Sequence, residues 1–297
     1  MNTLLIVGPG DIGRRALPTL LANYHVTALV RMHRTGARES TLGCREIRGE
    51  LDDPASLAPL FGVATHVIHL APPPEQGRID TRTRNLIQAL SGGAMVAQGL
   101  PSRFVYVSTT GVYGDCQGSL IDEGRPVNPA TDRARRRVDA EEQLLAWGQR
   151  HGVAVSILRV PGIYASDRLP VERVRRGTPV LIDGDDVFTN HIHADDLANI
   201  VCATLERGGA GEIYNTIDDS ELKMGAWFNL IADRARLARP RQISRQAAAS
   251  GEIPPPLLSF MSESRRISNA KMKRSLGIVL RYPTVYDGVP AHIEPEH

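Results

Sequence analysis

Residues 3–23, TLLIVGPGDIGRRALPTLLAN, decide the fold. A short apolar run is followed at once by glycines in the pattern G-x-G-x-x-G, and then by apolar residues at helical spacing. In such a turn the first glycine permits a tight bend, the second lets a pyrophosphate reach the backbone, and the third lets helix and strand approach. The free N–H groups at the helix start favour an anion. The pattern predicts a dinucleotide site at Gly8, Gly10, Asp11, Ile12 and Gly13. The alternative is a plain strand-to-helix turn.

The rest of the first half alternates between two kinds of segment. Buried-strand patterns occur at 3–7, 26–30, 66–70, 103–107 and 153–159, and helical patterns at 12–23, 53–61, 79–91 and 132–150. Nearly continuous apolar strands separated by helices are typical of a parallel sheet covered on both faces. The pattern therefore predicts an α/β fold with a Rossmann-type doubly wound parallel sheet.

After residue 160 the alternation loosens, which indicates a second, smaller unit. An Arg-, Pro- and Asp-rich excursion covers 165–190, and further elements are expected at 194–206 (helix), 212–216 (strand), 221–237 and 269–276 (helices). We expect residues 1–164 plus about 191–216 to form the cofactor-binding domain. Residues of about 165–190 plus 217–297 should form a mixed α/β lobe that binds the substrate.

Composition excludes several classes of protein. The 297 residues carry 35 basic and 33 acidic side chains, a net charge of +2 that gives no support to nucleic-acid binding. No apolar run approaches the roughly 18 residues of a membrane helix. Three widely spaced cysteines (Cys44, Cys116 and Cys202) fit a reducing compartment and match no zinc spacing. We expect a cytoplasmic protein without a metal site.

The end of the second expected strand bears on cofactor choice. Arg31, His33 and Arg34 follow it, and no carboxylate occurs until Glu39. A carboxylate here would hold the ribose of NAD, whereas an arginine binds a 2′-phosphate. The sequence predicts NADP(H) in preference to NAD(H), with Arg31 and Arg34 as contacts, unless these arginines are merely solvated.

Five segments together resemble the extended branch of the short-chain dehydrogenase/reductase superfamily, whose members are similar to nucleotide-sugar epimerases and dehydratases. The segments are 49–53 (GELDD), 69–72 (HLAP), 107–114 (VSTTGVYG), 159–164 (RVPGIY) and 191–198 (HIHADDLA). The resemblance implies cofactor contacts at Leu51, Leu70, Ala71, Pro72 and Pro161. It also accounts for His193 as a structural residue.

The resemblance breaks at the active site. The family's Tyr-x-x-x-Lys pair would fall on the helix after Asn128-Pro129, where this chain has Arg133 and Arg137. No lysine occurs before Lys223. A lysine one turn away lowers the pKa of the tyrosine, but a guanidinium does not give up its proton. The chain therefore resembles atypical extended members that lack the catalytic tyrosine.

Several residues remain as candidates for substrate chemistry. The resemblance places Thr109, with Thr110 beside it, where the substrate binds. Tyr113 or Tyr164 is a replacement acid if a cation lowers its pKa; otherwise the tyrosines pack in the core and a third group, or none, takes the role. The arginines of 133–137 either bind an anionic substrate such as a diphosphate or form a solvated helix face. Arg265 and Arg266 correspond to a basic turn that faces the substrate in extended members.

These observations leave two hypotheses. The first is an NADP(H)-dependent oxidoreductase or epimerase-like enzyme, acting on a nucleotide sugar or another small carbonyl or alcohol with an altered proton donor. The second is a non-catalytic NADP(H) sensor that controls a partner. The resemblance also implies a possible homodimer through the helices around 79–91 and 132–150.

Overall fold

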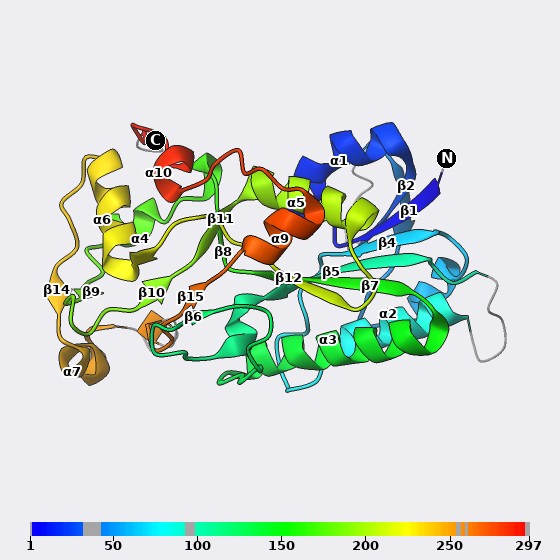
Figure 1. Ribbon diagram of the computed structural model, residues 1–297, viewed down its shortest axis with the longest axis horizontal. Helices are drawn as coiled ribbons and strands as arrows, with labels where there is room; N and C mark the ends of the chain where they lie inside the picture. Colours follow the sequence, from blue (N-terminus) through cyan, green and yellow to red (C-terminus); the bar gives the residue numbers. More distant parts are fainter. Residues whose placement is uncertain (1, 32–42, 93–98, 254–256, 259–260, 295–297) are drawn as a thin grey trace.

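A seven-stranded parallel sheet forms the centre of the molecule in the computed structural model, which describes residues 2–31, 43–92, 99–253, 257–258 and 261–294 (Figure 1). The strand order is β12-β7-β5-β4-β1-β2-β3, so the chain winds outward in both directions from β1 and β4. The strands are β1 (Asn2–Val7), β2 (Tyr24–Val30), β3 (Arg45–Arg48), β4 (His66–His69), β5 (Arg103–Thr109), β7 (Ala154–Val160) and β12 (Glu212–Asn215). The predicted doubly wound sheet is confirmed.

Helices cover both faces of this sheet. Alternate residues of one strand point to opposite faces. Leu4 and Ile6 therefore contact the core under α1 (Asp11–Asn23), α5 (Ala194–Arg207) and α9 (Ala270–Leu276). Leu5 and Val7 contact the other core, under η1 (Pro54–Leu60), α2 (Thr81–Ser91) and α3 (Asp132–His151). Burial on both faces explains why the strands read as continuous apolar runs.

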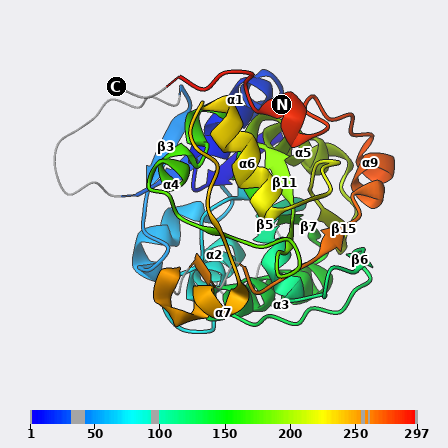
Figure 2. The ribbon, with the colours of Figure 1, turned by 90° about the vertical axis from the view of Figure 1, so that its left-hand side faces the viewer.

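Other segments of the second half form a smaller lobe at the left of Figure 1, and Figure 2 looks onto it. Its apolar core includes Val174, Leu222, Trp227, Phe228, Ile231 and Val285. The helical elements are α4 (Val171–Arg175), α6 (Met224–Arg234), α7 (Arg245–Ala247), α10 (Val285–Gly288), η3 (Ser166–Arg168) and η4 (Ala248–Glu252). The two-stranded pairs join β8 (Gly162–Tyr164) to β11 (His191–His193), β9 (Val180–Leu181) to β14 (Gln242–Ile243), β10 (Phe188–Thr189) to β13 (Leu222–Lys223), and β6 (Leu120–Ile121) to β15 (Arg266–Ile267).

Local details differ from the sequence-based expectations. The edge strand β3 was not predicted, because its residues Arg-Glu-Ile-Arg alternate and bury only Ile47. The helix expected at 221–237 is limited to α6, since Leu222 and Lys223 pair with β10 as a strand instead. The helix α9 ends as expected at Gly277, which has a left-handed φ of 58°.

The helix α3 buries one of the arginines of 133–137. A solvated helix face was one of the two alternatives for these arginines, but Arg136 is only 6% exposed. Its Nη1 donates a hydrogen bond of 2.5 Å to the carbonyl oxygen of Gly77, in the segment that follows β4. The segment around Gly77 covers the first turns of α3 but lies far from α3 in the sequence. The helical periodicity of α3 therefore could not reveal this contact.

Candidate functional site

The glycine turn after β1 has one open side. Gly8 has a φ of +77°, and a Cβ there would lie 2.8 Å from the backbone of Ala71. A Cβ on Gly13 would lie 3.2 Å from Cδ1 of Leu70. A Cβ on Gly10 would meet only the carbonyl oxygen of Gly8, at 4.0 Å. Two glycines are therefore required by close packing, while the space beside Gly10 is free for a ligand.

The acidic residue in this turn is neutralised by two arginines. Asp11 pairs through Oδ1 with Nε of Arg15 and through Oδ2 with Nη1 of Arg168, both at 2.9 Å. Arg15 also contacts Asp167 and Asp195, at 2.8 and 2.7 Å. These contacts tie the start of α1 to η3 and to the start of α5, and they offset a negative charge close to an expected phosphate position.

The other predicted cofactor residues follow the carboxyl ends of neighbouring strands. Arg31 is exposed directly after β2, while Arg34 lies outside the described residues. Leu51 follows β3, and its carbonyl oxygen accepts a hydrogen bond of 2.8 Å from Asn85. The remaining residues come at the ends of β4 and β7: Leu70, Ala71, Pro72 and Pro161. Parallel strands bring them to one edge of the sheet, where ligands bind in open α/β folds.

The main cavity of about 650 Å³ opens at this edge. It is lined by residues after β4, β5 and β7, by the start of α3, and by the smaller lobe. Of the predicted site residues it brings together Pro72, Thr109, Thr110, Pro161 and Arg265. The sequence reading did not single out Phe188, Thr189, Asn190 or Glu263, which also line it. These four lie in short connecting elements without a recognisable motif.

Thr109 presents a hydroxyl group at the end of β5. Its Oγ1 accepts a hydrogen bond of 3.2 Å from the backbone N–H of Gly111, at the start of η2 (Thr110–Tyr113). An oxygen that accepts from the backbone can still donate its own hydrogen to a ligand. Thr110 also lines the cavity but is only 4% exposed.

Neither candidate tyrosine reaches the cavity wall. Tyr113 is 1% exposed, and its hydroxyl donates a hydrogen bond of 2.8 Å to Oδ1 of Asn215. Burial raises the pKa of Tyr113, although the Arg159 guanidinium lies 4.8 Å above its ring. Tyr164 is 2% exposed in the core of the smaller lobe and donates to the carbonyl oxygen of Thr284 at 3.2 Å. Burial also raises the pKa of Tyr164, with Asp218 adding to the effect.

Arginines form the wall of the cavity at the start of α3, where the resemblance aligns Arg133 and Arg137 with the family's tyrosine and lysine. Arg133, Arg136 and Arg137 all line the main cavity. Nη1 of Arg137 donates to the hydroxyl oxygen of Tyr106 at 2.9 Å and to the carbonyl oxygen of Val107 at 2.8 Å. Arg137 is therefore held in place two residues before Thr109.

A buried ion pair links α3 to β7, two of the elements whose ends line the cavity. Arg159 on β7 and Glu141 on α3 meet at 2.7 Å, and each side chain is 5% exposed. Glu141 also accepts a hydrogen bond of 2.5 Å from the hydroxyl of Ser108. The pair connects α3 to the ends of β5 and β7, which carry Thr109 and Pro161 to the cavity.

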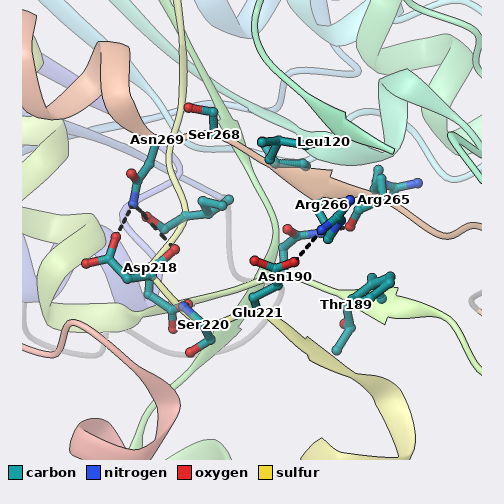
Figure 3. A pocket seen from close by; sticks show the side chains of 14 residues that line it. Leu120, Thr189, Asn190, Asp218, Ser220, Glu221, Arg265, Arg266, Ser268 and Asn269 are labelled. Carbon is teal, nitrogen blue, oxygen red and sulfur yellow. Dashed lines mark hydrogen bonds and ion pairs between the residues drawn. The ribbon is translucent and has the colours of Figure 1, made fainter. Parts of the chain in front are cut away.

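Figure 3 shows a second cavity, of about 190 Å³. It adjoins the first, with which it has lining residues in common. The two share Phe188, Thr189, Asn190 and Arg265. Arg265 donates to Glu263 at 2.6 Å and to the carbonyl oxygen of Gly114 at 2.7 Å. Arg266 faces only the second cavity, where it pairs with Glu221 at 2.7 Å. Of the two predicted arginines, Arg265 thus lines both cavities and Arg266 only the second.

Asp218 on the second cavity has an unusual environment. It is 1% exposed, and its Oδ2 has no hydrogen-bond partner in the described part of the chain. Burial raises the pKa of its carboxyl group from 3.8 to about 7, and hydrogen bonds from Ser220 oppose the rise. The folded protein therefore keeps this proton at pH values where the unfolded chain has lost it.

We expect Asp218 to make stability fall as the pH rises from about 4 to 7. Its contribution is complete below the pKa of the unfolded carboxyl and is lost as the pH rises through the raised value. The slope is on the order of 1 kcal/mol per pH unit. Urea denaturation measures the free energy of unfolding at pH 5 and pH 8. This free energy should fall less between the two pH values in Asp218→Asn than in the wild type. Glu142→Gln, on the exposed face of α3, should match the wild type. An unchanged loss in Asp218→Asn would contradict this assignment.

The described residues contain no metal-ligand cluster and no helix long and apolar enough to cross a membrane. His191 is buried beside Trp227, with ring centroids 4.4 Å apart, and burial lowers its pKa to about 3. Nδ1 of His193 accepts a hydrogen bond of 3.2 Å from the N–H of Asp195 and so caps α5. Both histidines therefore have packing or capping environments.

The sheet, the glycine turn and the cavity at the strand ends define a Rossmann-type dinucleotide-binding protein. The model of the NAD dependent epimerase/dehydratase family matches residues 4–216, and the chain belongs to this family. Its relatives include reductases and dehydratases, so this is a family of NAD(P)-dependent enzymes.

Two relatives show the range of activities. A 4-hydroxy-2-methyl-3-oxo-4-farnesyl-3,4-dihydroquinoline-1-oxide ketoreductase from Stigmatella aurantiaca is 26% identical over 85% of this chain and 80% of its own length. A GDP-6-deoxy-D-mannose reductase from Pseudomonas aeruginosa is 30% identical over 64% and 70%.

Solved structures share the fold. A UDP-glucose 4-epimerase from Thermotoga maritima, with UDP-glucose, has a TM-score of 0.76 at 16% identity, covering 98% of this chain and 97% of its own. A dTDP-glucose 4,6-dehydratase from Streptomyces venezuelae with NAD bound has a TM-score of 0.73 at 22% identity, covering 96% and 94%.

Proposed function

We propose that this protein is an NADP(H)-dependent oxidoreductase that interconverts a carbonyl and an alcohol on a small molecule in the main cavity. The observation that carries this proposal is that the glycine turn packs against the segment that leads to the wall of that cavity. Gly8 packs against Ala71, and the next residue, Pro72, lines the cavity together with Thr109. A dinucleotide on the turn can thus extend its nicotinamide end toward Thr109.

The residues at the turn fit such a cofactor. The side of Gly10 is open, the N-terminus of the 13-residue helix α1 follows directly, and Asp11 is neutralised by Arg15 and Arg168. Backbone N–H groups at a helix start bind phosphate. When bound, a nicotinamide supplies or accepts the hydride.

The side chains of the cavity supply binding and electrostatics. In this proposal the Thr109 hydroxyl donates a hydrogen bond to the substrate oxygen. Arg137 carries a permanent charge that stabilises negative charge on this oxygen, but it cannot deliver a proton. No tyrosine or lysine is among the described residues that line either cavity. We therefore propose that water supplies the proton and that Tyr113 and Tyr164 have structural roles.

The preference for NADP(H) rests on Arg31. This residue is exposed at the carboxyl end of β2, next to the β1 turn, where a 2′-phosphate would lie. We expect Arg31→Ala to weaken NADPH binding by roughly tenfold or more, because a charge-assisted pair is lost. NADH binding should change less than twofold. Calorimetric titration of both cofactors measures this, with the exposed Arg150→Ala as control. An equal loss for NADPH and NADH would rule out a 2′-phosphate contact.

Turnover tests the enzymatic role. Calorimetry with NADPH, NADP⁺, NADH and NAD⁺ should show binding of both phosphorylated forms. NADPH oxidation with a panel of small carbonyl compounds should then fall in Thr109→Val by roughly a hundredfold, the scale of a lost transition-state hydrogen-bond donor. If none of the four dinucleotides binds, the proposal fails. A large affinity gap between NADPH and NADP⁺ without turnover would favour the sensor, since a switch needs differential affinity.

A further inference from the structure

One wall of the main cavity is positively charged. Arg133, Arg136 and Arg137 lie at positions i, i+3 and i+4 of α3, so their side chains share one helix face. They belong to the first two turns of a 20-residue helix, whose free N–H groups add positive potential at this end. The side chains and the backbone therefore both contribute positive electrostatic potential at this wall.

Arg136 is the member whose environment indicates a ligand. Its side chain is more than nine-tenths buried and lines the cavity. Nη1 donates to Gly77, but Nε is buried without a hydrogen-bond partner among the described residues. No described carboxylate forms an ion pair with Arg136 or Arg137. A buried guanidinium without a counter-ion is costly, and a bound anion would remove this cost.

The described acidic residues of the cavity form no ion pair with Arg136 or Arg137. Two glutamates line the cavity, against four arginines. Glu263 is paired with Arg265 at 2.6 Å, on the side of the smaller lobe, and it also interacts electrostatically with Arg133. Glu75 is exposed in the segment after β4. The α3 wall therefore keeps a net positive charge facing the interior.

We infer that the substrate carries an oxyanion group next to its reacting carbon, and that Arg136 and Arg133 bind this group. The inference rests on the proposed function and deepens it. Arg137 is anchored at Val107, two residues before Thr109, so one member of the arginine wall is held at the strand end that presents the Thr109 hydroxyl to the same cavity. A guanidinium binds carboxylate or phosphate oxygens through paired N–H donors. An oxo acid or hydroxy acid satisfies both features.

Anion binding by the purified protein tests this inference. Calorimetric titration with malonate, inorganic phosphate and the neutral malonamide should show binding of at least one anion and none of malonamide. Arg136→Gln should weaken anion binding by roughly tenfold or more. The control Arg135→Gln removes the same charge from the same helix, at a residue that pairs with Asp132 and does not line the cavity. Its affinity should stay within twofold of the wild type.

The two anions distinguish the chemical source of the oxyanion. Tighter malonate binding identifies a carboxylate, and tighter phosphate binding identifies a phosphate ester. Arg133→Gln, at an exposed position, is a second variant in case Arg136→Gln does not fold. It should also weaken anion binding several-fold. The inference is overturned if neither anion binds, if malonamide binds as tightly, or if the Arg133, Arg135 and Arg136 variants lose affinity equally.

Failure of this inference is separable from failure of the proposed function. NADPH titrated into the same variants should bind as in the wild type, because the glycine turn is unchanged. Dinucleotide binding without Arg136-dependent anion binding removes only the oxyanion site. If the protein binds no dinucleotide but binds the anion through Arg136, the proposed function is wrong and the oxyanion site is supported.

Discussion

Replacement of Gly10 by valine should abolish tight dinucleotide binding while leaving the fold intact. A Cβ at Gly10 meets no atom closer than 4.0 Å, and the backbone angles there (φ −73°, ψ −153°) are accessible to other residues. The added side chain would occupy the space through which a pyrophosphate reaches the backbone. We expect the affinity for NADPH to fall about 100-fold or more, equivalent to about 2.7 kcal/mol. Calorimetry measures the affinity, and thermal unfolding without ligand measures the stability.

The chain offers a matched control for this substitution. Gly184 also has open space around its Cβ position and no left-handed φ, but it lies in the smaller lobe, between β9 and β10. Gly184→Val should leave both affinity and stability unchanged. If Gly10→Val binds NADPH as the wild type does, the open side of the turn does not hold the cofactor. A drop in melting temperature in Gly10→Val alone would instead indicate a steric role in folding.

The second large effect is expected at the buried ion pair. Glu141→Gln leaves the Arg159 guanidinium buried without an anion, and breaking such a pair costs about 3 kcal/mol or more. For a chain of this size we expect the melting temperature to fall by roughly 5–10 °C. Differential scanning calorimetry measures this fall.

A double variant separates the ion pair from packing. Glu141→Leu combined with Arg159→Met removes both charges and keeps similar volume, so it should recover much of the stability lost in the single variant. The exposed pair between Arg239 and Asp233 serves as a control, since Asp233→Asn should leave the melting temperature nearly unchanged. A loss of similar size at both pairs would show that burial does not determine the effect.

Local sequence patterns predicted the central fold because the sheet is parallel. Strands buried on both faces must be continuously apolar, so β1, β4 and β7 are visible as short hydrophobic runs. The edge strand β3 was not predicted from the sequence, because it buries only one of its four residues. The glycine turn was equally visible, since the bend at Gly8 and the close packing at Gly13 exclude side chains.

The sequence by itself determined the α/β class and the glycine turn, and it predicts that Arg133 and Arg137 stand where the family has its Tyr-x-x-x-Lys pair. Only the tertiary structure placed Tyr113 and Tyr164 in packed cores and brought Arg136 to the wall of the main cavity. The physical reason is the range of the interactions. Helix and strand periods depend on neighbouring residues, whereas the burial of Arg136 depends on a segment 59 residues earlier in the chain. The environment of a side chain is set by such distant contacts, and these form only when the chain folds.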